Sequence, residues 1–452
     1  MMIFSFYSIL SLAVAERPTE GGLFAFDATD DVQFYDEGMI RVHYSISGNN
    51  VAILNDLDQN GTPDYVELVA HTANDVLEFY ADVGFRFPIA EEAVGLNDLG
   101  GTSAFDFYLV DFGGNSDGMF GVDGCRGTIC AGHMVMENDF QGYGYPSLEE
   151  ATDVLVSHEL FHAVQAAYHA GQPSWLSEGS AVWAEWLYNP EVRDFLQFSS
   201  AYLGETERSL HKPPSGMTTS FSYGTAIFFA FWDEYYGEEV SRMVSLQESL
   251  ENSDESNMID AVLAQMDDVQ LDWMTFSKWN LATNIRSGEM SSYSFASQLY
   301  GLQSEMEGVI LEDDYRFYPL ATTYFELEHL GGPCTFAYVG DDEDVQFSLH
   351  PVVNGDKVGL SVKEWRIGDE AIWTESFEAG EYWVIGTLPM LTSNSQKIEF
   401  CLGAECLIPE IEDTGLGSED DVKSGCQVQP VATNLWMVAC LIGIRRRSRV
   451  CT

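Results

Sequence analysis

S-H-E-L-F-H, residues 157–162, lies within 151–170, a stretch that contains neither Gly nor Pro and has apolar residues at helical spacing. In a helix, residues four apart lie on one face, one turn apart. His158 and His162 can therefore offer two imidazole nitrogens to one zinc ion, and Glu159 can reach a water molecule as general base. The alternative is two surface histidines on an amphipathic helix without a metal.

A third zinc ligand has to come from the residues that follow. A metzincin would have Gly and His three and six residues after the second His, but those positions hold Gln165 and Tyr168. Instead, Gly-Gln-Pro at 171–173 ends the helix, and a second helical stretch follows. An antiparallel return can bring Glu178 onto the metal. Glu185, two turns further on the same face, is the alternative, either as ligand or as a carboxylate that orients one of the histidines.

H-E-L-F-H followed by W-L-S-E-G-S-A-V-W-A-E at 175–185 resembles the gluzincin metallopeptidases, the group of the thermolysin-like and aminopeptidase N-like enzymes. The resemblance covers about thirty residues. It implies a zincin-like fold with a small sheet and a mostly helical second part. It also implies that Glu178 is the third ligand, because it falls on the Glu of the W-L-N-E-G-x-A run of the aminopeptidase branch. No G-x-M-x-N motif occurs upstream, so aminopeptidase activity is not implied.

The same resemblance implies a catalytic role for Tyr223. In aminopeptidase-like gluzincins, a Tyr at the start of a similar helix stabilises the oxyanion. Residues 221–237 predict one buried helix that ends at Gly237, and Tyr223 lies near its start. A structural Tyr with a hydrogen-bonded hydroxyl is the alternative, and His211, in a Lys-Pro-Pro loop, is a rival donor.

Residues 56–67, D-L-D-Q-N-G-T-P-D-Y-V-E, match the twelve-residue calcium loop of an EF-hand. A hard cation needs about six oxygen ligands, and this spacing supplies them, with Gly61 at the sharp turn. No entering helix precedes the loop, which indicates an isolated structural calcium site rather than a sensor. A metal-free turn is the alternative. The predicted ligands are Asp56, Asp58, Asn60, Thr62 through its carbonyl, Asp64 and Glu67.

The composition excludes some partners. The chain has 452 residues, 46% of them apolar, which is enough for two or three domains with real cores. With 20 Lys and Arg against 72 Asp and Glu, the net charge is −52. A nucleic-acid partner is excluded because its phosphates would be repelled. Such a surface suits surroundings that contain salt or calcium.

The first fifteen residues predict export. Ile3 begins an uncharged apolar run that ends in Ala13-Val14-Ala15, the pattern of a signal peptide and its cleavage site at 1–15. Export implies an oxidising compartment, which permits disulfides. Cys125 and Cys130 can close one small loop. For Cys334, the expected partner is either Cys401 or Cys406.

The pattern of segments predicts an α+β fold. Strands are expected at 39–46, 104–112 and 131–136, and helices at 64–80, at 151–170 after a capping box that starts at Ser147, and from 174 onward. The metallopeptidase domain is expected to span 16–315. Short Val-, Tyr- and Phe-rich runs from 318 to 402 predict a small β-sandwich at 316–407, as a substrate- or surface-binding accessory.

The C-terminal end has three parts after an acidic linker at 408–425: Gly425-Cys426, an apolar stretch at 431–444, and a basic cluster at 445–449. This order resembles the MYXO-CTERM sorting tails of myxobacterial exported proteins, which are processed near the Cys. The resemblance implies a tail at 426–452, a sorting protease as partner, and transient membrane contact. The apolar stretch is short for a lasting span.

Together these features predict a secreted zinc peptidase that acts on proteins or peptides, attached to the cell surface or released. Zinc and a structural calcium are its expected cofactors. Two other functions remain open at this point. One is a calcium-stabilised surface or adhesion protein with an inert zinc site, and the other is a zinc hydrolase of a non-peptide bond.

Overall fold

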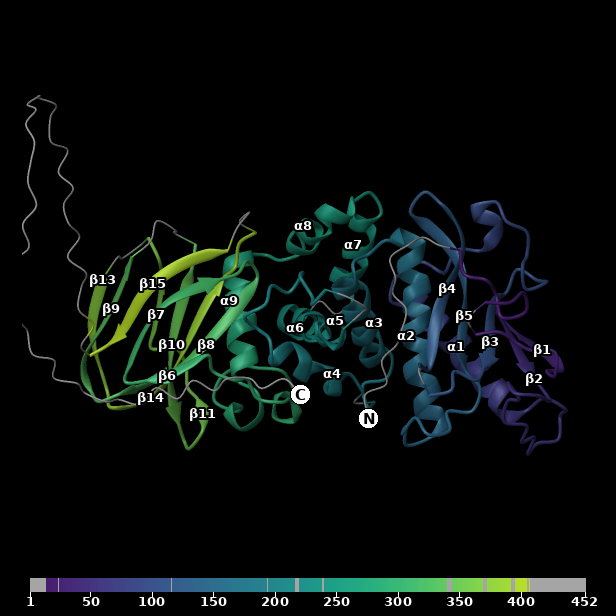
Figure 1. Cartoon of the computed structure of the whole chain (residues 1–452), viewed down its shortest axis with the longest axis horizontal. Helices are drawn as coiled ribbons and strands as arrows, with labels where there is room; N and C mark the ends of the chain where they lie inside the picture. Colours follow the sequence, from purple (N-terminus) through teal and green to yellow (C-terminus); the bar gives the residue numbers. More distant parts are fainter. Residues whose placement is uncertain are drawn as a thin grey trace, which may run out of the picture. The chain divides into compact units, whose positions relative to one another are not determined.

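A computed structural model describes residues 14–406, apart from 23, 115, 193, 216–218, 238–239, 340–343, 369–371, 392–394 and 405. The fold is α+β, with three sheets and a set of helices (Figure 1). Most of the predicted signal peptide, the acidic linker and the sorting tail lie outside the described residues. All described residues belong to one compact unit of the chain.

The first sheet has five strands in the order β1-β2-β3-β5-β4. The central pairs β2–β3 and β3–β5 are parallel, whereas β1 and β4 pair antiparallel at the edges. The strand predictions are confirmed to within a few residues. The strands are β1 (Val32–Glu37), β2 (Ile40–Ser45), β3 (Phe105–Val110), β4 (Gly118–Arg126) and β5 (Ile129–Glu137).

Two long helices pack on this sheet, α1 (Asp64–Asp82) and α2 (Leu148–His169) (Figure 1). The predicted cap of α2 is confirmed, since Ser147 Oγ accepts from Glu150 N at 3.1 Å. Almost every side chain of α2 after its first turn is buried, because the helix lies between the sheet on one side and α1 and α3 (Ser174–Tyr188) on others. A short 3₁₀ helix, η1 (Glu91–Val94), adjoins β4 and β5.

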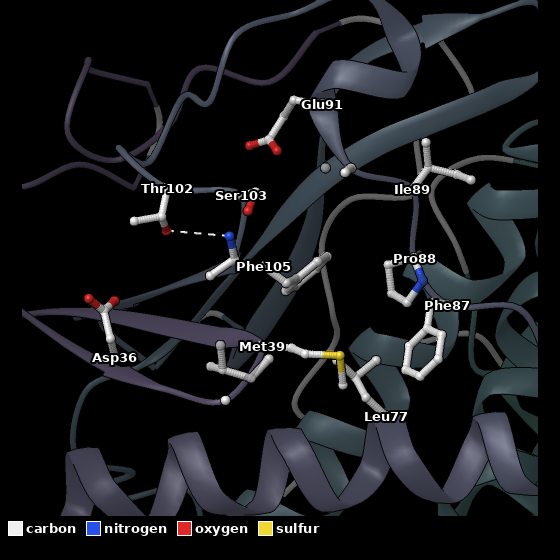
Figure 2. Close-up of a pocket in the computed structure, with 15 residues that line it drawn as sticks. Asp36, Met39, Leu77, Phe87, Pro88, Ile89, Glu91, Thr102, Ser103 and Phe105 are labelled. Atoms are coloured by element: carbon white, nitrogen blue, oxygen red, sulfur yellow. Dashed lines mark hydrogen bonds between the residues drawn. The ribbon is translucent and has the colours of Figure 1, made fainter.

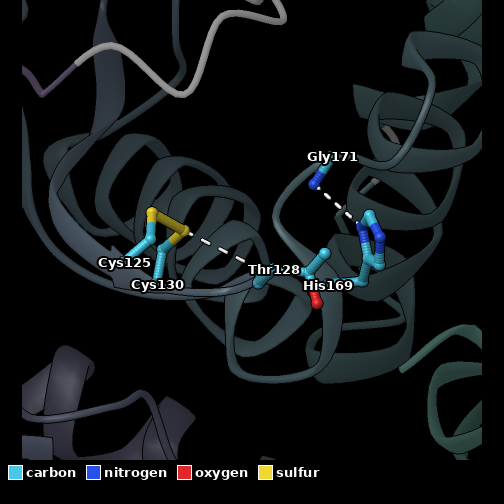
Figure 3. Close-up of a disulfide and its surroundings, with 5 residues drawn as sticks. All are labelled: Cys125, Thr128, Cys130, His169 and Gly171. Carbon is cyan, nitrogen blue, oxygen red and sulfur yellow. Dashed lines mark hydrogen bonds between the residues drawn. A yellow bond between two sulfur atoms is a disulfide. The ribbon is translucent and has the colours of Figure 1, made fainter. Parts of the chain in front are cut away.

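A hairpin tip fixes the end of α2. The predicted disulfide Cys125–Cys130 is confirmed and closes the β4–β5 turn (Figure 3). Thr128 in that turn accepts a hydrogen bond from Ala170 N at 2.8 Å, directly after the last residue of α2. The helix that carries His158 and His162, the two predicted zinc ligands, is thereby held at its C-terminal end by the sheet.

The N-terminal segment is held by a buried ion cluster that the sequence analysis did not foresee. Arg17 is 1% exposed, and its guanidinium pairs with Glu91 at 2.6 Å and with Asp123 at 2.6 Å. Asp106 accepts from the same guanidinium, and Tyr108 adds a hydroxyl at 3.1 Å. The strands β3 and β4 and the helix η1 are thus tied to one side chain.

The middle of the chain is helical. The predicted single helix over 221–237 is wrong, because it breaks into two at Thr225, whose hydroxyl bonds Trp175 O at 2.6 Å. Gly237 ends the second piece with φ 63°, as predicted. After α3 come α4 (Asp194–Leu203), α5 (Ser220–Gly224), α6 (Ala226–Tyr236), α7 (Ser241–Leu250), η2 (Glu255–Asn257), α8 (Met258–Leu263), α9 (Val269–Leu281), η3 (Asn284–Arg286) and η4 (Ala296–Gln298).

The last part is all strand and forms two sheets. One has the order β11-β10-β14-β8-β6 with β12 beside β10, and the other β13-β9-β15-β7. Both contribute to one apolar core, with Phe325, Phe347 and Val384 from the first and Phe336 and Phe400 from the second. The strands are β6 (Met306–Gly308), β7 (Ile310–Phe317), β8 (Ala321–His329), β9 (Gly332–Val339), β10 (Gln346–Val353), β11 (Lys357–Val358), β12 (Lys363–Arg366), β13 (Ile372–Phe377), β14 (Gly380–Leu388) and β15 (Gln396–Gly403).

The predicted pairing of Cys334 is wrong. Cys401 and Cys406 bond to each other across five residues, and Cys334 is a buried free thiol on β9. Burial raises the pKa of this thiol to about 11, so it stays protonated at neutral pH. The strands β9 and β15 are neighbours, but their register places Cys401 opposite Ala337, three residues from Cys334, and Cys401 bonds instead to Cys406, five residues further along the chain.

The strand region packs directly on the helices. Ser277 Oγ of α9 lies 2.7 Å from Thr322 Oγ1 of β8, and Tyr324 donates to Ser277 O at 2.8 Å. Leu320, Tyr324 and Trp383 belong to the same apolar core as the helices and the first sheet. No described helix has both the length and the apolar character needed to cross a bilayer.

Candidate metal centre

Three predicted ligands converge on one point. His158 and His162, one turn apart on α2, turn their Nε2 atoms toward each other at 3.1 Å. Glu178, in the second turn of α3, places Oε2 at 3.4 Å from each of these nitrogens. His158 and His162 belong to α2 and Glu178 to α3, and these two helices pack against each other. They form one of two groups of possible metal ligands among the described residues.

The hydrogen bonds around His162 determine its tautomer, that is, which ring nitrogen carries the proton and which has a free lone pair. Gln165 Nε2 donates to Ser177 O at 2.8 Å, and a carbonyl can only accept, so the amide orientation is fixed. Gln165 Oε1 therefore faces His162 Nδ1, at 2.8 Å, and Nδ1 must carry the proton. In the neutral ring, Nε2 then has a free lone pair directed at His158 and Glu178. This is the tautomer that a metal ligand needs.

Glu185 performs the same task for His158. Its Oε1 lies 2.6 Å from His158 Nδ1, on the side of the ring away from Glu178. Of the two carboxylates that the sequence left open, Glu178 lies among the converging donor atoms and Glu185 lies behind one of them. A carboxylate behind a ligating His fixes its ring and raises its basicity.

Three acceptor atoms this close together need a cation between them. Without a metal, protonated histidines take that place: burial raises the pKa of Glu178, but the charge of protonated His162 and hydrogen bonds from both histidines lower it overall. A metal ion bound by the three side chains would likewise lower the pKa of Glu178 and favour its ionised form. Two nitrogens and one carboxylate oxygen form the donor set of catalytic zinc sites, which keep a further position open. The residues therefore fit zinc.

Glu159, the predicted general base, is buried next to His158. It is 3% exposed, and its Oε2 is buried without a hydrogen-bond partner among the described residues. Burial raises the pKa of Glu159, opposed by the charges of His162 and His158. A carboxylate with a raised pKa takes up and releases a proton more readily near neutral pH.

A cavity of about 440 Å³ gives access to this centre. Glu159 and His158 line it, and so does the ring of Tyr223, which stacks on His158 with ring centroids 6.0 Å apart. The predicted oxyanion donor thus reaches the same cavity as the predicted base. His211, the rival donor, is not among the described residues that line it.

The predicted calcium loop runs into the first turn of α1, which contains Asp64 and Glu67. Gly61 turns the chain with φ 97°, and the backbone N–H groups of residues 57, 60 and 61 bond the carboxylates of Asp64 and Asp56 at 3.0–3.1 Å. Asp56, Asp58 and Asp64 form the second group of possible metal ligands among the described residues. Glu67 lies close, since it accepts from Asn60 Nδ2 at 2.7 Å. The carboxylate oxygens fit a hard cation such as calcium.

A second cavity, of about 470 Å³, lies between α1, β2 and η1 and shares no lining residue with the first (Figure 2). Figure 2 shows its apolar floor, which includes Leu77, Met39 and Phe87. Its two carboxylates already have cation partners, Asp36 with Arg41 and Glu91 with Arg17. It therefore lacks the unpaired groups that mark the first cavity.

Sequence reasoning missed several residues of the centre. Gln165 was noticed only because it occupies a position where a metzincin has Gly, yet it fixes the tautomer of His162. Asp117, Glu150 and Asp194 line the first cavity, but Asp117 and Asp194 were not singled out, and Glu150 was considered only as part of the capping box of α2. Gln165 follows His162 by three residues, one helical turn, so its position could have been used. The other three come from separate elements, and nothing local marks them.

Comparison with known proteins adds little. No protein-family model matches the chain, and no curated protein does. Among solved structures, it is similar to PliG of Aeromonas hydrophila, a periplasmic inhibitor of g-type lysozyme, at 15% identity, over 21% of this chain and 82% of that chain. The TM-score of 0.16 is too low to support any statement on fold or function.

Proposed function

We propose that this protein is a secreted, zinc-dependent peptidase of the gluzincin type. The convergence of His158 Nε2, His162 Nε2 and Glu178 Oε2, each 3.1–3.4 Å from the next, supports this proposal most directly. The unpaired Glu159 carboxylate in the adjoining cavity supports hydrolysis rather than a purely structural metal. In the same proposal the sheet β1–β5 with α1 to α9 is a zincin-like domain, and the strands β6–β15 form a β-sandwich accessory.

Zinc held by His158, His162 and Glu178 would polarise the peptide carbonyl and lower the pKa of a bound water to about 7. Glu159 accepts the proton that the attacking water gives up and passes it to the leaving amine, so one water is consumed for each bond broken. The hydroxyl of Tyr223 donates a hydrogen bond to the negatively charged oxygen that forms from the substrate carbonyl. Glu185 and Gln165 hold the two rings in the orientation described above.

The remaining predicted features belong to export and stability. The signal peptide at 1–15 would direct the chain to an oxidising compartment, in keeping with the two disulfides. The calcium loop would fix the start of α1. A MYXO-CTERM-like tail at 426–452, cut by a sorting protease, would decide between attachment to the cell surface and release, with transient membrane contact.

The test is digestion of casein by the purified mature protein, with and without a zinc chelator. We expect cleavage that the chelator abolishes and added zinc restores. If casein stays intact while a chelator-sensitive hydrolysis of another bond is found, the centre is a zinc hydrolase of a different class. If zinc binds and no hydrolysis of any kind follows, a non-catalytic surface protein is the better description.

Glu159→Gln is the matched variant for this test. It keeps the shape of the side chain and removes the base, so it should bind zinc normally and lose on the order of 10²–10⁴ in turnover. Glu149→Gln, an exposed position in the first turn of α2, controls for charge loss on the same helix. Full activity of Glu159→Gln would contradict the mechanism.

A further inference from the structure

The cavity beside the metal centre is acidic on several sides. Asp117 precedes β4, Glu150 lies in the first turn of α2, and Asp194 begins α4. These three carboxylates line the cavity together with Glu159 and Glu185. No Lys or Arg is found in its described lining, and none pairs with these three carboxylates in the described part of the chain.

The charges lie close enough to act on one another. Burial raises the pKa of Asp194 to about 6, the charge of Asp117 adds to that shift, and a hydrogen bond from Gln197 opposes it. Burial likewise raises the pKa of Asp117, although Tyr145 donates to it at 2.8 Å. Partly buried carboxylates that repel one another are stabilised when a cation comes between them.

Aromatic rings form the rest of the wall. Tyr145 and Phe198 line the cavity and are partly buried. Tyr300 also lines it and is exposed, with 62% of its surface accessible. Rings of this kind bind the apolar stems of Lys and Arg and the cations that these stems carry. A free α-amino group has no such stem, so the wall favours a basic side chain over a chain terminus.

We infer that this cavity binds a Lys or Arg side chain of the peptide substrate, next to the bond that is cut. Because the same cavity includes His158 and Glu159, the basic residue lies within one or two positions of that bond. Asp194, Asp117 and Glu150 are the specificity-determining residues. The net charge of −52 favours encounter with basic substrates from a distance, but the preference for one position depends on the cavity. This inference rests on the proposed peptidase function.

The test begins with the wild-type protein and casein, whose cleavage sites are mapped by mass spectrometry. The best-cut sequence is then made as an N-acetylated, internally quenched peptide, once with its Lys or Arg and once with norleucine or citrulline in that place. We expect the basic peptide to be cut with kcat/KM roughly 10- to 100-fold higher, the usual effect of one charge-assisted contact. Acetylation removes any contribution from a free amino terminus.

Asp194→Asn should lower the ratio of kcat/KM between the basic and the neutral peptide about tenfold or more. Glu150→Gln is the second variant, because its side chain has no hydrogen bond or ion pair to the described part of the chain, and it should lower the same ratio. Asp260→Asn, an exposed acid on α8, removes the same charge elsewhere and should leave the ratio unchanged.

The outcomes separate the two proposals. If the wild-type protein cuts the basic and neutral peptides equally, or if Asp260→Asn changes the ratio as much as Asp194→Asn does, this inference is overturned and the peptidase function stands. If only peptides with a free amino terminus are cut, the inference is also overturned, because the cavity then binds a terminus. If no peptide is cut in a chelator-sensitive way, the proposed function is overturned and the inference with it.

Discussion

Two clusters in this protein contain buried carboxylates, and they differ in the groups that surround those carboxylates. Around Arg17, three carboxylates converge on one guanidinium, with Glu91 and Asp123 each at 2.6 Å. At the candidate metal centre, two imidazole nitrogens and the Glu178 carboxylate converge on a point to which the described part of the chain brings no Lys or Arg.

The difference shows which cluster is structural and which needs a ligand. Buried carboxylates are costly unless a cation pairs with them and their hydrogen bonds are satisfied. Arg17 satisfies both needs from within the chain, so its cluster is complete. The outer nitrogens of the two histidines are bonded, to Glu185 and Gln165, but their inner nitrogens and Glu178 Oε2 face one another. Under the proposed function, a zinc ion would complete that arrangement.

The largest effect is expected from removing the internal cation. Arg17→Met keeps much of the volume and leaves Glu91 without its cation partner, while Asp106 and Asp123 each keep only a histidine, His43 and His133. The loss of this buried charge should lower the free energy of unfolding by about 3–5 kcal/mol. Urea unfolding of the mature protein measures this. Arg208→Met is the matched control, since Arg208 and Glu205 are both more than a third exposed and such a pair contributes about 0–1 kcal/mol. Equal losses in both variants would show that the buried cluster stabilises no more than a surface pair.

The calcium loop is an exposed counterpart to both clusters. Its carboxylates accept backbone N–H groups and face solvent, so they tolerate the absence of a cation better than Glu178 does. Calcium at a hundred times its Kd should add about 2.7 kcal/mol of stability and raise Tm. Asp58→Asn should weaken that response, and Asp98→Asn, an exposed acid outside the loop, should not. A Tm unaffected by calcium would leave the loop as an ordinary turn.

Replacing the carboxylate behind His158 should have a moderate effect on zinc. Glu185→Gln keeps the hydrogen bond but loses its charge, and variants of this kind weaken metal affinity about 10- to 100-fold, or 1.4–2.8 kcal/mol. Competition with a coloured chelator measures the affinity. Glu178→Gln provides the comparison, and it should lose far more. If Glu185→Gln abolished binding as completely as Glu178→Gln, Glu185 would be a ligand and the comparison between the two clusters would need revision.

A structural feature could be predicted from the sequence when the residues that form it lie close together along the chain. The spacing of His158 and His162 is local, and so is the cap formed by Ser147 and Glu150, so both were predictable. Glu178 needed one further assumption, that the chain reverses after 171–173. Where only local rules were required, the predicted elements and the structure agree.

The features that failed or were missed depend on distant parts of the chain. Arg17 meets partners 74 to 106 residues away, and no periodicity marks such a meeting. The exception is Cys334, which was assigned Cys401 or Cys406 as a partner distant in sequence, whereas those two cysteines bond to each other across only five residues. The acidic wall of the cavity likewise comes from three separate elements. Which buried charges find a cation is decided by the fold, so it becomes visible only in the structure.

Glu137 shows a third response to burial, and the smallest expected effect. It is 2% exposed, accepts from Tyr143 and from Phe112 N at 2.8 and 3.0 Å, and has no Lys or Arg partner in the described part of the chain. Burial raises its pKa to about 7, although those hydrogen bonds oppose the shift. The carboxyl group of Glu137 is therefore neutralised by a bound proton and not by a Lys or Arg side chain.

The sign of the pH effect follows from that raised pKa. The folded protein holds the proton more tightly than the unfolded chain, so this stabilisation is complete below pH 4.5 and is lost as the pH rises through about 7. Glu137→Gln cannot lose a proton, so its unfolding free energy relative to wild type should improve by roughly 1–2 kcal/mol between pH 5 and pH 8 after allowance for solvent screening. Glu78→Gln, at an exposed position of α1, should show no such change. A difference that stays constant with pH would mean that Glu137 remains ionised in the fold, and that a buried carboxylate can be satisfied here by hydrogen bonds alone.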